Sequence, residues 1–307
     1  MSSDIRHHGT TLRDSLPLLA TYITQETLSF HQRDPQRIAE RVDGQTLVKG
    51  MAWRGQPARL SIRLLETRAD IELAIDGKAG DDDAHALRRL VHRMLGLTQR
   101  IEDFEAAWRE HPQLGRLIER HPGLRVPLAA TPFEALTWAV TGQQISVGAA
   151  VSLRRKLIQA SGLIHSEGLA CYPDAPRLAQ LSVADLRAAG FSSTKANTLL
   201  ALSRQVEDGQ LPLDEWAGTL PVEEMRTRLL AVRGIGPWTV NYTLLRGFGW
   251  LDGSLHGDAA VRRGLQLLIG SGEAPSAEET RSWLAPFEPW RALVAAHLWR
   301  LQTPAGY

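Results

Sequence analysis

The sequence has few of the features that mark several large protein classes. Its 307 residues contain one cysteine, Cys171, which rules out an intramolecular disulfide and a cysteine-ligated iron–sulfur cluster. A reducing, cytoplasmic compartment is therefore expected. No apolar run reaches the length of a membrane span, and the opening MSSDIRHHGTTLRD lacks the apolar core of a signal peptide.

A strong net charge and a metal-binding pattern are also missing. The formal net charge is +1, and the content of 43% hydrophobic and 22% charged residues is typical of a soluble globular protein. Charge is concentrated locally, since residues 225–263 contain six Arg and two Asp, as a phosphate-binding patch would. No His, Cys, Asp or Glu cluster has metal-ligand spacing, and no nucleotide-binding fingerprint occurs, so we expect no required cofactor.

Two regions differ in their hydrophobic periodicity. Residues 46–54 and 58–65 read as strands joined by a hairpin turn at 55–57, and residues 71–75 alternate with period two. A helix is predicted at 84–95, and from residue 101 the pattern is helical to the end. The prediction is an α+β fold, with a mixed N-terminal domain (1–120) holding a small antiparallel sheet and an all-helical domain (121–307).

The most informative stretch begins where an apolar helical run ends at Val232. Gly234 and Gly236 flank Ile235, and a second helix begins near Trp238, so a helix-hairpin-helix is predicted at about 222–246. Free backbone N–H groups at a helix N-terminus suit a phosphate, and they read no base sequence. Taken alone, the glycines also fit a tight turn with a C-cap in a helical bundle.

A carboxylate follows the hairpin. Asp258 stands 22 residues after Gly236, between the chain break at Gly257 and a new helix. The position is typical of an N-cap, and a plain cap would explain Asp258 by itself. The competing acid, Asp252, lies in a polar turn and is interpreted as structural.

The two motifs Arg-Gly-Ile-Gly-Pro-Trp-Thr-Val-Asn-Tyr and Gly-Asp-Ala-Ala-Val-Arg-Arg together resemble the helix-hairpin-helix DNA glycosylases, and within them the bacterial 3-methyladenine DNA glycosylase II family. The resemblance covers about 125–307. It implies a monofunctional glycosylase of base excision repair that acts as a monomer on duplex DNA. Such an enzyme flips out an alkylated purine, and the carboxylate, here Asp258, stabilises the cationic sugar and orients water.

The resemblance also assigns further residues. Trp238, Tyr242 and Trp299 would form an aromatic base pocket, attractive to a cationic base. Trp238 stands where lyase-competent relatives carry a lysine, so no lyase step is expected. DNA contacts would come from the hairpin residues Arg233, Gly234, Ile235, Gly236 and Thr239.

Without the resemblance, the aromatic residues would be interpreted as core packing, as Trp283 and Trp290 are. His297 is interpreted as a structural histidine with satisfied hydrogen bonds.

Three points stay open at this stage. Gln143 or Gln144 would fill the gap left by an extruded base, although the pair also fits a polar helix break. A structural cation could bind the backbone carbonyls of Leu230, Val232 and Ile235. The alternatives to the leading function are a glycosylase for deaminated or oxidised bases, for which no convincing proton donor is evident, and a non-catalytic DNA-binding protein.

Overall fold

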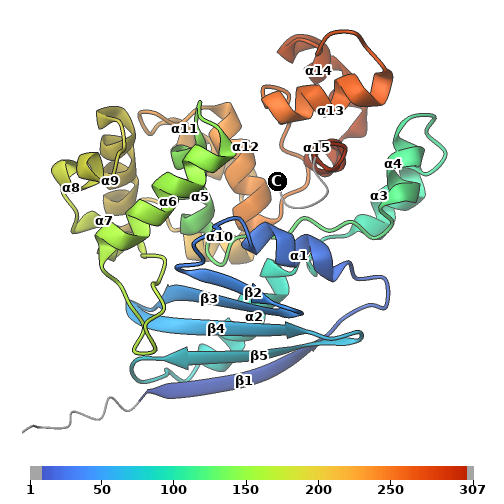
Figure 1. Ribbon diagram of the computed structural model, residues 1–307. Coiled ribbons are helices and arrows are strands. Elements are labelled where there is room, and N and C mark those ends of the chain that lie inside the picture. Colours follow the sequence, from blue (N-terminus) through green and yellow to red (C-terminus); the bar gives the residue numbers. More distant parts are fainter. Residues whose placement is uncertain (1–8, 303–307) are drawn as a thin grey trace, which may run out of the picture.

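The computed structural model describes residues 9–302, which form an antiparallel sheet with helices stacked on one side of it (Figure 1). The strands are β1 (Thr10–Pro17), β2 (Glu40–Asp43), β3 (Thr46–Trp53), β4 (Gln56–Leu64) and β5 (Arg68–Ile75), in the order β1-β5-β4-β3-β2. The α+β fold and the three predicted strands are confirmed. β1 and β2, the two edge strands, were not predicted.

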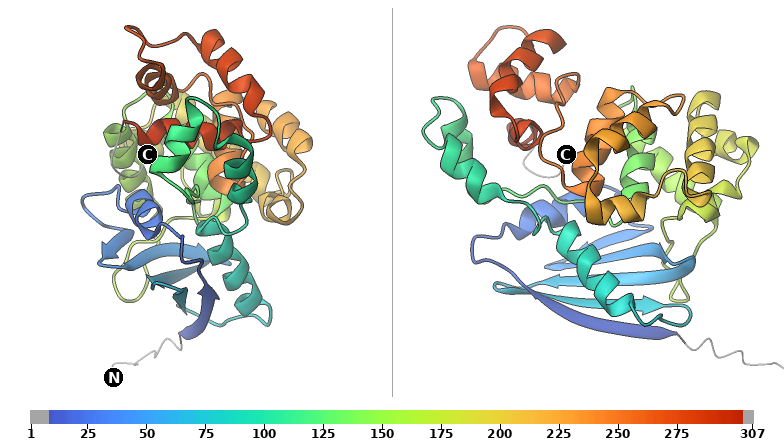
Figure 2. Two further views of the ribbon diagram at one scale, coloured as in Figure 1. Left: turned by 90° about the vertical axis from the view of Figure 1, so that its right-hand side faces the viewer. Right: turned by 180° about the vertical axis from the view of Figure 1, so that it is seen from behind.

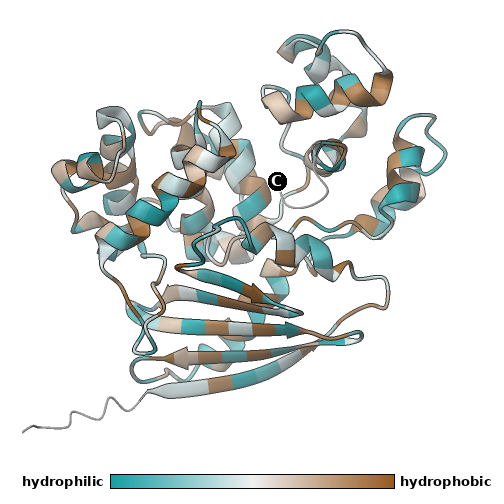
Figure 3. Cartoon of the chain, viewed as in Figure 1, coloured by the Kyte–Doolittle hydropathy of each residue, from teal (hydrophilic) through white to brown (hydrophobic). Residues whose placement is uncertain are grey.

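The central strands bury one residue in two. Along β4, Leu60 and Ile62 are fully buried while Ser61 between them is half-exposed, and teal and brown alternate along this strand in Figure 3. Arg54 and Gly55 both have positive φ, 47° and 80°, which makes the tight two-residue turn between β3 and β4. The predicted helix is present as α2 (Asp83–Met94), and its Leu87, Val91 and Met94 pack in the core of the sheet.

Most of the remaining chain is helical, and the helices predicted from the sequence are present. The helices outside the hairpin are α1 (Thr24–His31), α3 (Ile101–Trp108), α4 (Leu114–Arg120), α5 (Pro132–Gly142), α6 (Val147–Ser161), α7 (Ala175–Ala179), α8 (Val183–Ala188), α9 (Ser193–Glu207), α10 (Leu213–Thr219), α13 (Ala259–Ile269), α14 (Ala277–Leu284) and α15 (Arg291–Arg300). Helices α1 and α4 and the short α7 and α10 were not predicted individually. Within residues 9–302, no helix is both long enough and apolar enough to span a membrane.

The helices form two cores with the hairpin between them (Figure 2). One core gathers residues of α5–α11, and the other gathers residues of α3, α4 and α13–α15. Helix α12 (Pro237–Thr243) contributes Val240 to the first and Tyr242 to the second. The division at residue 120 stays a prediction, and α3 and α4, which precede it, pack with the C-terminal helices.

A buried ionic cluster joins the sheet to the helices. Lys49 of β3, fully buried, donates to Glu134 of α5 at 2.7 Å and also pairs with Glu40 of β2. Arg154 of α6 bridges the same two carboxylates at 2.6 and 3.1 Å. Burial alone would raise the pKa of Glu134, but Lys49 and Arg154 outweigh it and lower that pKa. The cluster therefore fixes the start of α5 on the sheet.

Candidate active site

The hairpin turn connects α11 (Val222–Leu230) to α12. Gly234 has φ +94°, and a Cβ there would lie 2.3 Å from Oγ1 of Thr198, so only glycine fits. Gly236 has φ −115° and open space around it, so the protein itself does not require glycine there. No side chain caps the N-terminus of α12. Its first residue, Pro237, has no N–H, so the uncapped amides begin at Trp238.

The predicted DNA-contact residues are not equally accessible. The side chain of Arg233 is exposed, whereas Ile235 is buried. Thr239 is only 2% exposed, and its hydroxyl accepts a hydrogen bond from Gln143 at 2.8 Å. The side chain of Thr239 therefore braces the hairpin from inside the protein.

Asp258 is both a helix cap and the centre of a hydrogen-bond network. Its Oδ1 accepts the backbone N–H groups of Ala260 and Val261 at 2.9 and 3.0 Å, as an N-cap does. The indole of Trp299 donates to the same oxygen at 3.2 Å. Oδ2 takes no part in capping and accepts the Trp238 indole at 2.9 Å. The half-buried carboxylate is thus oriented from both sides and still reaches solvent.

The three predicted aromatic side chains meet beside this carboxylate. Trp238 and Tyr242 stack with centroids 5.2 Å apart and planes at 28°. Tyr242 and Trp299 are 6.3 Å apart and tilted by 54°. A flat base in van der Waals contact with two rings needs about 7 Å between them. A base entering between Tyr242 and Trp299 must therefore move the rings apart or contact their edges.

Sequence reasoning missed the side chains that line the floor of this site. Trp138 of α5 donates its indole N–H to the hydroxyl of Tyr242 at 2.9 Å. The guanidinium of Arg246 lies over the rings of Phe30 and Trp299, 4.5 and 5.4 Å from their centroids. No local pattern could reveal these contacts, because Trp138 precedes Tyr242 by 104 residues.

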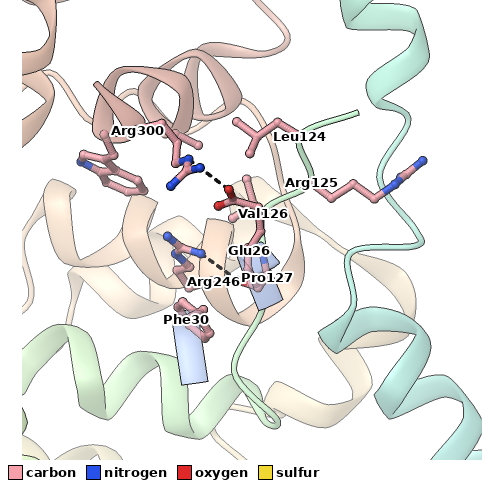
Figure 4. A pocket seen from close by; sticks show the side chains of 10 residues that line it. Glu26, Phe30, Leu124, Arg125, Val126, Pro127, Arg246 and Arg300 are labelled. Carbon is pink, nitrogen blue, oxygen red and sulfur yellow. Dashed lines mark hydrogen bonds and ion pairs between the residues drawn. The ribbon is translucent and has the colours of Figure 1, made fainter. Parts of the chain in front are cut away.

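A pocket opens beside Trp299 (Figure 4). It is lined by Glu26, Phe30, Leu124, Arg125, Val126, Pro127, Arg246, Ala296, Trp299 and Arg300. Arg300 pairs with Glu26 at 3.0 Å, and Arg246 donates to the carbonyl of Pro127 at 2.9 Å. Burial lowers the pKa of Arg246 to about 10, which leaves it a cation at neutral pH.

The two candidate wedge residues have different environments. Gln143 donates to the carbonyl of Gly234 at 2.9 Å and to Thr239, so it braces the hairpin. Lys195 donates to the carbonyl of Gln143 at 2.8 Å. Gln144 is exposed and has φ +58°, a left-handed backbone conformation that residues other than glycine rarely adopt. The loop thus exposes Gln144, while the hydrogen bonds of Gln143 hold the loop against the hairpin and α9.

Two residues set aside in the sequence are structural. Asp252 forms a bidentate pair with Arg291 at 2.8 and 2.7 Å. His297 is buried against Phe104, and burial lowers its pKa to about 3. Its Nδ1 has no hydrogen-bond partner among residues 9–302.

The hairpin, with a carboxylate hydrogen-bonded to Trp238 and Trp299 beside it, is the arrangement that the resemblance to helix-hairpin-helix proteins predicts. Comparison with known families agrees with the geometry. Residues 137–289 match the family described as HhH-GPD superfamily base excision DNA repair protein. The matched stretch, residues 137–289, is a domain of this superfamily.

Individual relatives support the assignment. The chain is 32% identical over 190 residues to DNA-3-methyladenine glycosylase 2 of Escherichia coli, which covers 61% of this chain and 63% of that protein. It is 26% identical over 216 residues to DNA-3-methyladenine glycosylase of Bacillus subtilis, covering 69% and 71%. It therefore matches a little under two thirds of the first protein and somewhat more of the second.

Solved structures show the same fold. The 3-methyladenine DNA-glycosylase of Archaeoglobus fulgidus superposes with a TM-score of 0.78 at 22% identity, over 93% of this chain and 97% of that one. The Schizosaccharomyces pombe 3-methyladenine DNA glycosylase in complex with abasic DNA gives a TM-score of 0.55 at 26% identity, over 62% and 91%.

Proposed function

We propose that the protein is a monofunctional DNA glycosylase of base excision repair that hydrolyses the N-glycosidic bond of alkylated purines in duplex DNA. The observation that carries the proposal is the position of Asp258. Its Oδ2 bonds the indole of a pocket tryptophan, Trp238, at the side of the site where α12 begins. A merely structural cap would need only the two backbone bonds of Oδ1.

DNA would be held by its backbone. The uncapped amides of α12 and the exposed Arg233 suit a phosphate, and they bind any sequence. A base inside a duplex has to be extruded before it can be cut from its sugar. Gln144, at the tip of its loop, would occupy the gap, and Gln143 would hold that loop on the hairpin.

The chemistry needs one carboxylate. As the bond from C1′ to the base nitrogen breaks, its electron pair leaves with the base and the sugar becomes cationic. The negative charge of Asp258 stabilises this cation and orients a water molecule, whose oxygen bonds to C1′. The water gives up a proton, by way of Asp258, to the solvent, and this proton carries away the positive charge that the alkylated base brought. A base that is already cationic leaves as a neutral molecule, so no general acid is required for it.

Alkylated purines are the proposed substrates for two reasons. Relatives in Escherichia coli and Bacillus subtilis are named 3-methyladenine glycosylases. The stacked rings of Trp238 and Tyr242 form an electron-rich wall, which favours a flat cationic base.

Water, not an amine, would be the nucleophile. Trp238 occupies the position where lyase-competent relatives carry lysine, and its indole is already bonded to Asp258. An abasic site would remain as the product.

A cation in the hairpin remains a proposal. The carbonyl of Val232 already accepts the N–H of Ile235 at 3.1 Å, but a carbonyl oxygen has a second lone pair. The carbonyl oxygens of Leu230 and Val232 are neutral donors, which suit a hard cation bound structurally. Action as a monomer in the cytoplasm likewise remains a prediction.

A non-catalytic helix-hairpin-helix protein would explain the hairpin but not the network around Asp258. Release of free bases from methylated, deaminated and oxidised duplexes, by the wild type and by Asp258→Asn, separates the two functions. We expect release of methylated purines by the wild type alone. DNA binding without release of any base by the wild type would contradict the proposal.

A further inference from the structure

Arg33, which follows α1, has one edge of its guanidinium without a partner. Its Nε and Nη2 are both buried, and neither forms a hydrogen bond with any other residue of the range 9–302. These two nitrogens lie on the same edge of the planar group, the edge that holds two oxygens of an oxyanion in a bidentate contact. A buried donor without an acceptor is costly, so two such donors side by side favour a ligand that supplies two oxygens.

Two aromatic rings restrict the position of this guanidinium. Its Cζ lies 4.2 Å from the ring centroid of Phe30 and 5.5 Å from that of Trp138. Contacts of this kind engage the faces of the guanidinium, so hydrogen bonds can form only at its edges. Trp138 is in turn hydrogen-bonded to Tyr242 at 2.9 Å. The group is therefore held in place before a ligand binds.

Arg33 lines a pocket between α1, α5 and α6. This pocket is separate from that of Figure 4, although Phe30 and Arg246 line both of them. The carboxylates that line it are already bonded to other cations, namely Asp34 to Arg155 at 2.7 Å, and Glu40 and Glu134 to Lys49 and Arg154. The acceptor that the edge of Arg33 requires is therefore expected from a bound anion.

A second guanidinium adds positive charge to this pocket. Burial lowers the pKa of Arg246 to about 10, and repulsion by Arg33 contributes to that shift. Arg246 is still a cation at neutral pH, so two like charges lie close to each other beside the pocket. An anion bound there offsets their repulsion, and its binding stabilises the folded protein.

His31 supplies an acceptor in the same pocket. It is 1% exposed, and its Nδ1 lies 3.0 Å from Oε1 of Glu40. The ionised Glu40 can only accept, so Nδ1 carries the hydrogen. Burial lowers the pKa of His31, which keeps the ring neutral at neutral pH and leaves a lone pair on Nε2. Nε2 has no hydrogen-bond partner among residues 9–302. A ligand with a hydroxyl group would supply the missing donor.

We infer that this pocket binds hydrogen phosphate, a small oxyanion that also carries a hydroxyl group, through the Nε–Nη2 edge of Arg33 and Nε2 of His31. Two phosphate oxygens accept from Arg33, and the hydroxyl group donates to His31. A phosphodiester of DNA has no such hydroxyl, so the site favours free phosphate over the strand. The inference does not depend on the proposed glycosylase activity.

Isothermal titration with inorganic phosphate and with sulfate, at neutral pH and constant ionic strength, tests the inference. Both anions supply acceptors, but sulfate has no hydroxyl at this pH. We expect the wild type to bind phosphate at least about tenfold more tightly than sulfate, because sulfate leaves His31 without its donor. Arg33→Lys keeps the charge and removes the bidentate edge, so phosphate affinity should fall by about tenfold or more. Arg33→Met should lose phosphate binding.

Arg233→Gln is the matched control, because the hairpin is a second place that suits a phosphate. Its phosphate affinity should equal that of the wild type. Thermal unfolding without phosphate checks that each variant is folded, and added phosphate should raise the Tm of the wild type but not that of Arg33→Met.

Four results would overturn the inference: no phosphate binding by the wild type, unchanged phosphate affinity in Arg33→Lys, equal affinity for the two anions, or loss of binding in Arg233→Gln alone. None of these measurements involves release of a base from DNA. The phosphate site and the proposed function therefore fail separately.

Discussion

The indole nitrogen of Trp238 lies 2.9 Å from Oδ2 of Asp258, although the two residues are 20 positions apart in the sequence. Trp238 is the second residue of the helix whose N-terminus forms the hairpin. Asp258 caps α13, a helix of the core that α3, α4 and α13–α15 form. The hydrogen bond therefore joins the element that would hold the DNA backbone to the group that would act on the sugar.

Trp238→Phe should keep an aromatic ring in the pocket and lose this bond. A hydrogen bond to a charged group contributes about 1.5–3 kcal/mol, so we expect single-turnover base release to fall by roughly tenfold or more with little change in DNA affinity. Trp283→Phe is the control, because the Trp283 indole donates to Gln113 at 3.3 Å, outside the pocket. Equal effects of the two substitutions would argue against an orienting role for Trp238.

The absence of a lyase step can be tested chemically. A lysine nucleophile forms a Schiff base with the sugar, which borohydride reduces to a stable adduct. With Trp238 at the matching position, we expect no borohydride-trapped protein–DNA adduct under conditions where free base is released. A trapped adduct would show an amine nucleophile and refute the monofunctional assignment.

The loop residues Gln143 and Gln144 should differ in their effects. Gln144→Ala removes the exposed tip, so base release from duplex DNA should fall by about tenfold while release from single strands changes little, because unstacking costs roughly a few kcal/mol per step. Gln143→Ala instead removes two hydrogen bonds to the hairpin and should lower the free energy of unfolding by about 1–2 kcal/mol. Equal losses on duplex and single strand for Gln144→Ala would exclude a wedge role.

The buried ionic cluster should make stability depend on pH. Burial would raise the pKa of Glu40, but Arg154, Lys49 and His31 outweigh it and hold that pKa well below its usual range, and the pKa of Glu134 is lowered too. A lowered pKa in the folded state stabilises the protein above the unfolded value, about 4.3 for Glu, and this contribution is lost as the pH falls. We expect urea unfolding to show a steep loss of stability below about pH 4.5.

Lys49→Met should remove about 3–5 kcal/mol of stability at neutral pH, because it leaves buried carboxylates with fewer partners. Its stability should also depend less on pH, since the pKa values of Glu40 and Glu134 would rise. Arg281→Gln, which breaks an exposed pair with Glu278, should cost under about 1 kcal/mol and leave the pH dependence unchanged. If Lys49→Met lost stability in acid as steeply as the wild type, groups outside this cluster would determine the pH dependence of the free energy of unfolding.

Local signals in the sequence were enough for much of the fold. The glycine before Asp258 predicted the start of α13, and Thr131 with proline next to it is a similar local start signal for α5. β1 was missed because it is an edge strand in which only Leu16 is buried, so its hydrophobic alternation is weak. β2 has four residues, too few for a periodic signal.

The site was predictable only in part, for a physical reason. Trp238 and Tyr242 are four residues apart on one helix, so their contact follows from helical geometry. Phe30 reaches the site from α1, Trp138 from α5, and Arg246 from the segment after α12. Such contacts depend on how the two cores and the sheet pack, which no local pattern encodes. The charged floor of the pocket therefore became visible only in the structure.

The most direct test of the account is Asp258→Asn. Asparagine is an equally good N-cap and keeps the side chain nearly unchanged in size, so the protein should stay folded and bind damaged duplex DNA with unchanged affinity. Single-turnover release of methylated purines should fall by about 10²-fold or more, because the negative charge that stabilises the cationic sugar is gone. Full base release by Asp258→Asn would contradict the account.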